Sequence, residues 1–511
     1  MSLLNNLQPQ KLWYFFEKIC SIPHPSKHEH KLRSYIIDLA KDYGCETKVD
    51  DYGNLLVIKK SQVGFENCKV VILQSHLDMV AQKSDELDFD FEHDPINLQI
   101  VDNEFVTACG TTLGADNGIG VATMCALIAD KELRHGELRF LFTTEEEIGL
   151  NGVSNLAPEF MQGDILLNLD SEDEGEIFIG CAGGIRTDAL IPIDVEDVVI
   201  FDDEKNEITQ KCHLVVEGLH GGHSGCDIHH NLGNGLKILS EIVWEAISYF
   251  GNVRLRYVAG GNADNAIVRR AEAYLFIDKN QADDLAEFII QQNVKYKQLL
   301  SDKDKNICIS LKNIQPRNNN ETAPAYSEKF QAQLLSTLLN TPNGVINYHH
   351  EMAGVVETST NLAIVTADCL DKAPVEKEHF LKITTSQRSS DNNLLTALSR
   401  RIAIHFEQLP RNTVFHRSHY VGWTPNPHSE ILRIVEKAMV KVLGIKPKVT
   451  VIHAGLECGA LSEYNPKIDM VSIGPDITAP HSPFEKVRIE SVEKFYDYLL
   501  ETLKNIPHKT T

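Results

Sequence analysis

Short apolar runs alternate with amphipathic segments over the first part of the chain. Runs rich in β-branched and other apolar residues predict buried strands, at 54–60, 69–76, 138–147 and 164–172. Apolar residues at helical spacing predict helices, at 27–44 and 119–130. Strands that are apolar along their whole length are typical of a sheet covered on both faces by helices. This pattern predicts an α/β domain with a central mixed sheet between helices.

The pattern changes after residue 187. Strand-like segments then combine with long amphipathic helices, at 234–250 and 281–300, which indicates an inserted α+β domain. After a proline-containing turn at 423–427, helices and short apolar strands alternate again, and we expect them to complete the first sheet. The predicted organisation is a catalytic domain in two parts around the insertion, at 1–187, 188–423 and 424–511.

Composition narrows the class of protein. The 511 residues are 42% hydrophobic, enough for a sizeable core, and at roughly 150 residues per domain they predict about three domains or two larger ones. The net charge of −23 argues against binding to nucleic acid or to an anionic membrane. The eleven cysteines include no CxxC pair, and no signal peptide or membrane-spanning segment stands out. We expect a cytoplasmic protein.

Histidines and carboxylates follow the predicted strands. In an open α/β sheet, ligands bind beyond the carboxyl ends of the strands, where these side chains would meet. Lysine and arginine are scarce in these segments, so closely spaced carboxylates would require cations. Histidine with carboxylate favours zinc or a similar ion, such as cobalt or manganese, over calcium. The residues concerned are His76, Asp78, Asp116, Glu145, Glu146, Glu147, Asp170 and His481.

Each of these motifs alone has an ordinary explanation. The pair His76 and Asp78 could form a local hydrogen bond, and a run of three glutamates often begins a helix. Asp116, in GADNG, could be a turn residue. Their joint occurrence after buried strands of one domain favours a metal site. Two ions would need a bridging carboxylate, and one further carboxylate, for which Glu146 is suited, could accept a proton from water.

Seven motifs together resemble the aminoacyl-histidine dipeptidases (Xaa-His dipeptidases, peptidase D). These belong to the co-catalytic zinc exopeptidase superfamily, which also includes peptidase T, carboxypeptidase G and aminoacylase. The resemblance covers nearly the whole chain, from SIPHPSKHE near its start to the last histidine motif. The motifs are SHLDMV, TTLGADNGIG, TEEEIGLNG, NLDSEDEGEIFIGCAGG, GLHGGHSGCDIH, HAGLECG and APHSPFE.

This resemblance implies two divalent metal ions, zinc first among them. His76, Asp116 and Asp170 would hold one ion, and Asp116 would bridge to a second ion held with Glu147 and His481. Asp78 would orient His76. Glu146 would be the general base, with Glu145 as the alternative because three glutamates are consecutive.

The inserted domain resembles the lid of these enzymes, which closes over the site and can form a homodimer. The resemblance implies that His223 hydrogen-bonds the scissile carbonyl oxygen, and that Asn265 and Arg388 bind the substrate carboxylate. The segment after Asn265 reads Ala-Ile-Val where many relatives read x-Ile-Pro. This difference concerns the conformation of the loop and therefore the role of Asn265. Gly455 would let backbone approach the substrate, and Glu457 would meet its free amino group.

The sequence thus predicts a two-metal dipeptidase that acts on unblocked dipeptides. The expected substrates are Xaa-His dipeptides such as β-alanyl-histidine. Two alternatives remain open at this stage. The same site could serve a related aminoacylase, carboxypeptidase or tripeptidase, because lid contacts set the substrate. The chain could also be an inactive relative that acts as a binding protein, although its ligand set and base are intact.

Overall fold

The chain forms two compact units in the computed structural model, which describes residues 3–314, 321–368, 370 and 378–509. Unit 1 contains the chain up to Cys181, the segment Trp423–Ile452 and the chain from Leu456 onward. Unit 2 contains Ala182–Gly422 and His453–Gly455. Unit 2 begins earlier than residue 188 because a strand that starts at residue 183 already pairs within its sheet.

Unit 1 is built on an eight-stranded mixed sheet, as predicted. Its four adjacent strands β6, β3, β7 and β23 run parallel to one another, and β1 and β2 pair antiparallel to their neighbours. Strand β8 pairs antiparallel to β23 and parallel to β22. The two strands from the C-terminal part of the chain, β22 and β23, complete this sheet. In spatial order the strands are β1 (Glu46–Val49), β2 (Leu55–Lys59), β6 (Leu138–Thr143), β3 (Val71–His76), β7 (Ile165–Asn168), β23 (Asp469–Ser472), β8 (Glu176–Cys181) and β22 (Lys448–Ile452).

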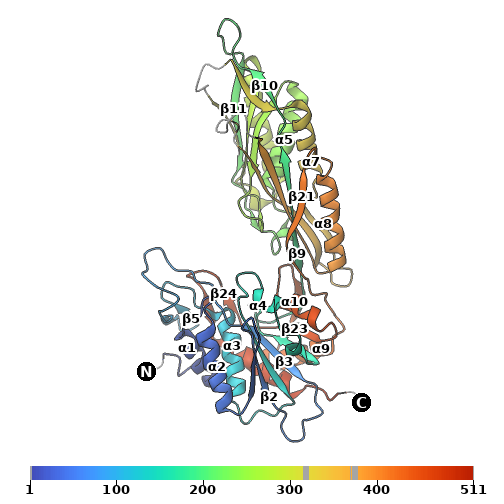
Figure 1. Ribbon diagram of the computed structural model, residues 1–511. Coiled ribbons are helices and arrows are strands. Elements are labelled where there is room, and N and C mark those ends of the chain that lie inside the picture. Colours follow the sequence, from blue (N-terminus) through green and yellow to red (C-terminus); the bar gives the residue numbers. More distant parts are fainter. Residues whose placement is uncertain (1–2, 315–320, 369, 371–377, 510–511) are drawn as a thin grey trace. The chain divides into compact units, whose positions relative to one another are not determined.

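Helices cover the sheet of unit 1. On one face, an apolar cluster that includes Ile72, Leu141 and Leu166 packs against α4, the 3-10 helix η1 and α10. Elsewhere α3 packs against β3 and α1, and Figure 1 shows α1, α2 and α3 grouped beside the strands. The helices are α1 (Gln10–Cys20), α2 (His30–Asp42), α3 (Ala115–Ile128), α4 (Asn151–Ser154), η1 (Pro158–Met161), α9 (Glu430–Leu443), α10 (Glu457–Tyr464) and α11 (Ile489–Lys504).

A small antiparallel sheet in unit 1 brings distant segments together. Its strands, in order, are β24 (Ile477–Thr478), β25 (Lys486–Arg488), β5 (Phe105–Ala108) and β4 (Leu98–Val101). The loop between β24 and β25 carries His481, and the chain after β5 leads to Asp116. Pairing of β25 with β5 therefore places these two segments side by side.

Unit 2 is built on an antiparallel sheet. Helices α5 to α8 pack on this sheet through one large apolar core, and Figure 1 shows α5, α7 and α8 along the strands. The strands, in order, are β16 (Cys308–Ile314), β11 (Thr209–Glu217), β15 (Ala271–Asp278), β13 (Arg254–Gly260), β19 (Val356–Ala367), β20 (Phe380–Ser389), β9 (Gly183–Pro192) and β21 (Thr413–Tyr420), with β18 (Gly344–Tyr348) on β19. The helices are α5 (Gly235–Phe250), α6 (Ala282–Leu299), α7 (Glu328–Asn340) and α8 (Asn392–Phe406).

Short elements complete unit 2. Two further pairs of strands are β10 (Val195–Val199) with β17 (Thr322–Tyr326), and β12 (Gly222–His223) with β14 (Ala266–Ile267). The 3-10 helices are η2 (Ile228–His230), η3 (Lys279–Gln281) and η4 (Asp302–Asp304). Local sequence sets the helix ends. The Asn234 side chain accepts from the backbone N–H groups of Leu236 and Lys237, and α5 ends at Gly251, whose φ is 77°.

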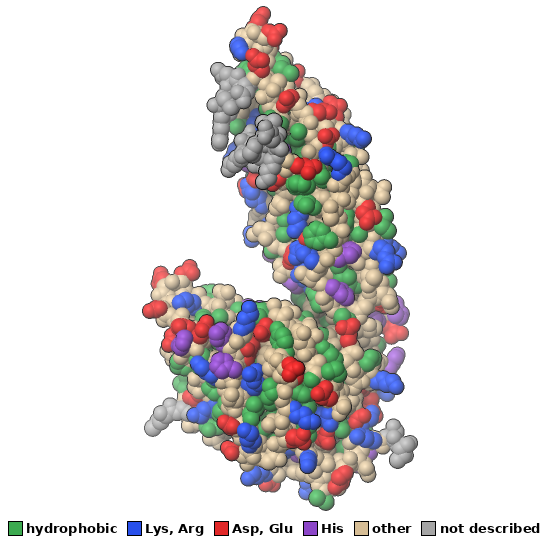
Figure 2. All heavy atoms as spheres, viewed as in Figure 1, with side chains coloured by type: hydrophobic (Ala, Val, Ile, Leu, Met, Phe, Trp, Pro, Cys, Tyr) green, Lys and Arg blue, Asp and Glu red, His purple; other side chains and the backbone are tan. Residues whose placement is uncertain are grey.

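Two hydrogen-bonded residues of unit 1, Cys181 and Trp423, flank the long segment 182–422 that belongs to unit 2. The backbone N–H of Cys181 donates to the carbonyl of Trp423 at 3.0 Å, and that of Trp423 donates back at 2.9 Å. Among the described residues, no helix has the length and apolar character that crossing a bilayer requires. On the face shown in Figure 2, lysine and arginine side chains are scattered among acidic ones.

Candidate metal centre and catalytic site

The carboxyl ends of three parallel strands meet at one edge of the unit 1 sheet. Strand β3 ends at His76, β6 ends three residues before Glu146, and β7 ends two residues before Asp170. In the pairing register, His76 lies beside Thr143, so the strand ends are level. The predicted convergence of these segments is therefore present.

Asp116 lies between two histidines. Its Oδ1 is 3.0 Å from Nε2 of His76, and its Oδ2 is 3.2 Å from Nε2 of His481. Possible ligand atoms of these segments also gather within 4.8 Å of one another, in three of the four such groups that the described residues form; the fourth, His349, His350 and Glu357, lies in unit 2. The three groups are His76, Asp116 and Asp170; Asp116, Glu147 and His481; and His76, Glu146 and Glu147. One carboxylate thus faces both halves of the site with separate oxygens.

The donor set fits a pair of divalent cations. Asp170 Oδ1 lies 3.4 Å from Nε2 of His76, and Glu147 Oε1 lies 3.0 Å from Nε2 of His481. Glu147 Oε1 is buried, and its described partner is this histidine nitrogen. Within the described part of the chain, no lysine or arginine forms an ion pair with Asp116, Glu147 or Asp170. Carboxylates gathered in this way lack positive charge, which cations with nitrogen and oxygen ligands would supply.

The electrostatics of the site reflect this crowding. Burial raises the pKa of Asp170 to about 6, even though His76 opposes the shift. Burial also raises the pKa of Glu146 well above its usual range, and Asp170 and Glu147 add to that effect. Hydrogen bonds with Asp116 and Glu147 raise the pKa of His481 to about 11. Without metal the site therefore retains protons, which ions would displace.

Asp78 connects two of the segments that carry ligands. Its backbone carbonyl accepts from Nδ1 of His76 at 2.9 Å, which leaves the lone pair of Nε2 directed at the acidic groups. Its carboxylate lies farther from that ring, at 3.5 Å, and accepts from the backbone N–H groups of Glu146 (3.0 Å) and Glu147 (3.2 Å). Asp78 thus fixes the glutamate segment as well as the histidine.

The three consecutive glutamates point in different directions. The carboxylate of Glu145 accepts from the Tyr52 hydroxyl and the Asn151 amide, each at 3.1 Å. The carboxylates of Glu146 and Glu147 instead gather with His76. This arrangement favours Glu146 over Glu145 as the group beside the metals.

Two residues that the sequence analysis did not select also contact ligands. Asn117 donates its amide to the carbonyl of Leu169 at 2.8 Å and to the carboxylate of Asp170. Glu485 is 2% exposed and accepts from backbone N–H groups of the segment that ends at Asp116. Glu485 follows His481 by four residues and is the last residue of the motif APHSPFE, so the motif could have drawn attention to it.

A second group of predicted residues lies in unit 2. Nδ1 of His223 accepts from the backbone N–H groups of Gly225 (3.3 Å) and Cys226 (3.1 Å), so the ring proton is on Nε2. Burial lowers the pKa of His223 to about 4, and Arg388 adds to this shift. His223 is therefore neutral, with a donor at Nε2.

Arg388 lies beside this histidine. Its Nη2 is 3.4 Å from Nε2 of His223, and with a proton on Nε2 both groups are donors, so a shared acceptor between them would satisfy both. Arg388 is 4% exposed, and its Nε is buried without a hydrogen-bond partner. Nη1 donates to the hydroxyl of Tyr420 at 2.8 Å. The Tyr420 ring fits against Gly184 and Gly455, where added Cβ atoms would come within 2.5 Å and 3.0 Å of it.

The other two predicted substrate contacts differ in their surroundings. Asn265 is exposed, and its carbonyl accepts from the backbone N–H of Ser224 at 2.7 Å, next to His223. Glu457 lies in unit 1 and is completely buried, and its carboxylate accepts from the side chains of Gln74 and Thr143. A substrate amino group would reach Glu457 only after a rearrangement, so that contact stays a prediction.

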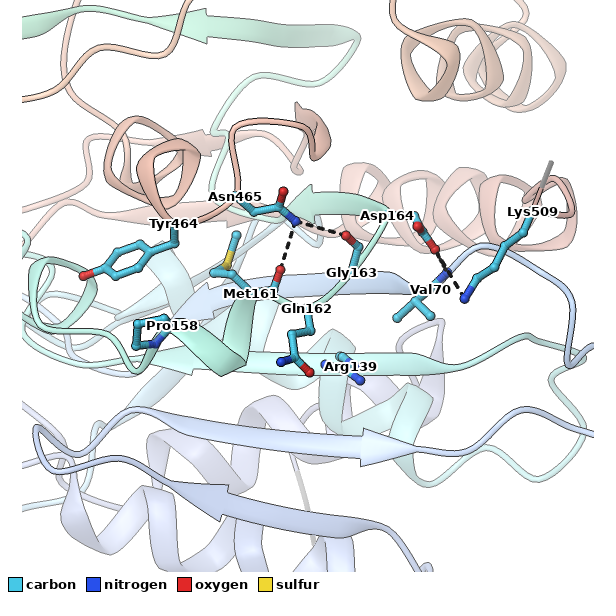
Figure 3. Close-up of a pocket in the computed structure, with 10 residues that line it drawn as sticks. All are labelled: Val70, Arg139, Pro158, Met161, Gln162, Gly163, Asp164, Tyr464, Asn465 and Lys509. Atoms are coloured by element: carbon cyan, nitrogen blue, oxygen red, sulfur yellow. Dashed lines mark hydrogen bonds and ion pairs between the residues drawn. The ribbon is translucent and has the colours of Figure 1, made fainter. Parts of the chain in front are cut away.

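The pocket drawn in Figure 3, of about 460 Å³, contains none of the predicted residues. It opens where β3 and β7 begin, beside Val70 and Gly163, whereas the acidic group lies where these strands end. Asn465 donates to the carbonyls of Met161 and Gly163 there, so this side chain is used in holding the loop. The predicted catalytic and metal-binding residues of unit 1 therefore lie at the other edge of the sheet.

Comparisons with known proteins agree on one family. Residues 72–505 match the model of peptidase family M20/M25/M40. The chain is 40% identical to the cytosol non-specific dipeptidase of Escherichia coli (strain K12), over the full length of both. It is similar to the crystal structure of aminoacylhistidine dipeptidase from Vibrio alginolyticus, with a TM-score of 0.87, 38% identity and 99% of each chain covered. Aminopeptidase PepT from Bacillus cereus shares the fold, with a TM-score of 0.59 at 14% identity, and the match covers 98% of this chain and 99% of that one.

Proposed function

Because the chain belongs to peptidase family M20/M25/M40, we propose that it is a cytoplasmic two-metal dipeptidase that hydrolyses unblocked dipeptides. The observation that carries this proposal is the position of Asp116 between His76 and His481, with Asp170 and Glu147 completing two groups of ligand atoms. An inactive relative would not need to keep both groups of ligand atoms together with the Glu146 carboxylate beside them.

Two zinc ions suit the ligands, and cobalt or manganese could share them. His76, Asp116 and Asp170 would hold one ion, and Asp116, Glu147 and His481 the other. When bound, such ions polarise the scissile carbonyl and lower the pKa of water. Asp78 would keep His76 and the glutamate segment in register around them.

Glu146 would move the proton. Its carboxylate lies beside the ligands, and its raised pKa suits a group that accepts a proton from water and then donates it to the leaving amine. Glu145 is less suited because its carboxylate already binds Tyr52 and Asn151.

Unit 2 would act as the lid and could also form a homodimer. The Nε2–H of His223 would donate to the carbonyl oxygen of the scissile bond. Arg388, whose buried Nε is unpartnered, would bind the substrate carboxylate together with Asn265. Gly455 would keep backbone close to the substrate and make room for Tyr420. Closure would exclude bulk water.

The names of two relatives bear on the substrate. The Escherichia coli relative is called a non-specific dipeptidase, and the Vibrio alginolyticus structure is called an aminoacylhistidine dipeptidase. We propose that Xaa-His dipeptides, β-alanyl-histidine among them, belong to a wider set of accepted dipeptides. An aminoacylase, carboxypeptidase or tripeptidase activity is the alternative within the same family.

A turnover panel tests this proposal. The metal-stripped protein is resupplied with zinc, cobalt or manganese and assayed on dipeptides, tripeptides, dipeptide amides and N-acyl amino acids. We expect metal-dependent cleavage of free dipeptides, and none of that activity in the D116N variant. Faster turnover of N-acyl amino acids or tripeptides would favour the alternative, and no hydrolysis with any metal would refute an enzymatic role.

A further inference from the structure

Glu485 holds the segment that carries Asp116 by four hydrogen bonds. Its Oε2 accepts from the backbone N–H groups of Leu113 (2.7 Å) and Gly114 (2.9 Å). Its Oε1 accepts from those of Ala115 (2.8 Å) and Asp116 (3.2 Å). One buried carboxylate therefore satisfies four consecutive backbone donors.

These donors have no local acceptor of their own. They lie at the start of α3, where the residue before the helix, Gly114, provides no side-chain cap. The backbone also leaves helical geometry at Asp116, whose ψ is 104°, so the helix itself does not fix the direction of this side chain. The position of the carboxylate that faces both histidines thus depends on a contact from elsewhere in the chain.

Glu485 is itself fixed close to the other histidine. The Thr107 hydroxyl, on β5, donates to the Glu485 carbonyl at 2.6 Å, and the Glu485 N–H donates to the carbonyl of Ser482 at 3.1 Å. Ser482 is the residue after His481. A single side chain therefore ties the segment of His481 to the segment of Asp116, the two ligands that face each other at 3.2 Å.

We infer that Glu485 is a positioning residue for the metal centre that contains His481, Glu147 and Asp116. Its carboxylate is not placed as a metal ligand, because both of its oxygens already accept from backbone N–H groups. It sets how precisely two of the three ligands of that centre converge. This inference rests on the proposed two-metal function and assigns Glu485 a role in the occupancy of one of the two ions.

The test measures zinc binding directly rather than activity. Zinc content per chain and dissociation constants are measured, by competition with a chromophoric chelator, for the full-length protein and the variants E485Q, E485D and D116N. In E485Q an amide NH₂ replaces one oxygen, so two of the four N–H groups face a donor. E485D keeps the charge, but its side chain is one methylene shorter and cannot reach all four.

Asp469 supplies the matched control. Its carboxylate also accepts from two backbone N–H groups in unit 1, those of Glu430 and Ile431 at 3.0 Å each, but it lies at the start of β23, at the opposite end of the sheet from the ligands. D469N therefore removes a similar contact without touching a ligand segment. Thermal unfolding of every variant without metal reports on folding separately.

We expect the wild-type protein and D469N to bind two zinc ions. In E485Q and E485D, the ion held by Asp116, Glu147 and His481 should bind about 10- to 100-fold more weakly, the range typical for groups that orient ligands, and the other ion, which shares only Asp116, should be weakened less. Wild-type affinity for both ions in E485Q would overturn the inference, as would weakening in E485Q with full affinity in E485D, which would indicate a charge effect alone. Absence of zinc binding by the wild-type protein would instead refute the proposed function.

Discussion

Replacing Glu146 with Gln tests the proposed general base separately from the proposed metal ligands. The backbone N–H of Glu146 is held by Asp78, so the segment should stay in place when the carboxylate becomes an amide. The amide cannot accept a proton from water. Loss of a general base lowers turnover by about 10²- to 10⁴-fold, which is about 2.7–5.4 kcal/mol of activation free energy at about 1.36 kcal/mol per decade.

The neighbouring glutamate provides the control. In E145Q the lost carboxylate is one that binds Tyr52 and Asn151, so kcat should stay within about threefold of the wild-type value. The assay is kcat on a free dipeptide with zinc at saturation, together with zinc content for each variant. Two zinc ions with greatly reduced kcat in E146Q, and little change in E145Q, are expected. The reverse order of the two variants would show that the assignment is wrong by one residue.

Three further predictions follow from other contacts. In Y420F, Arg388 loses the hydrogen bond that orients its guanidinium, so KM for free dipeptides should rise by up to about 10-fold with kcat nearly unchanged; an unaltered KM would contradict this role. E457Q should lower the free energy of unfolding by about 1–3 kcal/mol because the amide disturbs a buried network, whereas a raised KM at unchanged stability would support the substrate contact. The pKa of His481 is raised to about 11, so its protonated form stabilises the metal-free protein fully below the unfolded-state pKa, near 6.5, and this stabilisation is lost as the pH rises toward 11. Zinc must displace the His481 proton when it binds. Calorimetry in buffers of different ionisation enthalpy should therefore show proton release, and zinc should bind more tightly at higher pH.

The sequence predicted the elements that carry the chemistry because apolar runs mark them clearly. The strand that ends at His76 and the helix after Asp116 lie where the pattern of apolar residues places them. The gathering of carboxylates also followed from chemistry, since strand ends of one parallel sheet meet at one edge.

Contacts between a side chain and distant backbone were not predictable in this way. Glu485 binds four N–H groups, which every residue except proline possesses, so the bound segment carries no signal of its partner. Tyr420 likewise meets Arg388 only because β20 and β21 flank β9 in the folded sheet. Such partners become apparent only when the pairing of strands is known.

The hydrogen-bonded pair of Cys181 and Trp423 has a consequence for how this protein can change. Since the chain leaves unit 1 after Cys181 and re-enters it at Trp423, the segment 182–422 supplies no described strand of the eight-stranded sheet. The five proposed metal ligands, His76, Asp116, Glu147, Asp170 and His481, all lie outside that segment, in unit 1. Changes within that segment would therefore act on the proposed substrate contacts His223, Asn265 and Arg388 while the proposed metal ligands stay on the sheet of unit 1.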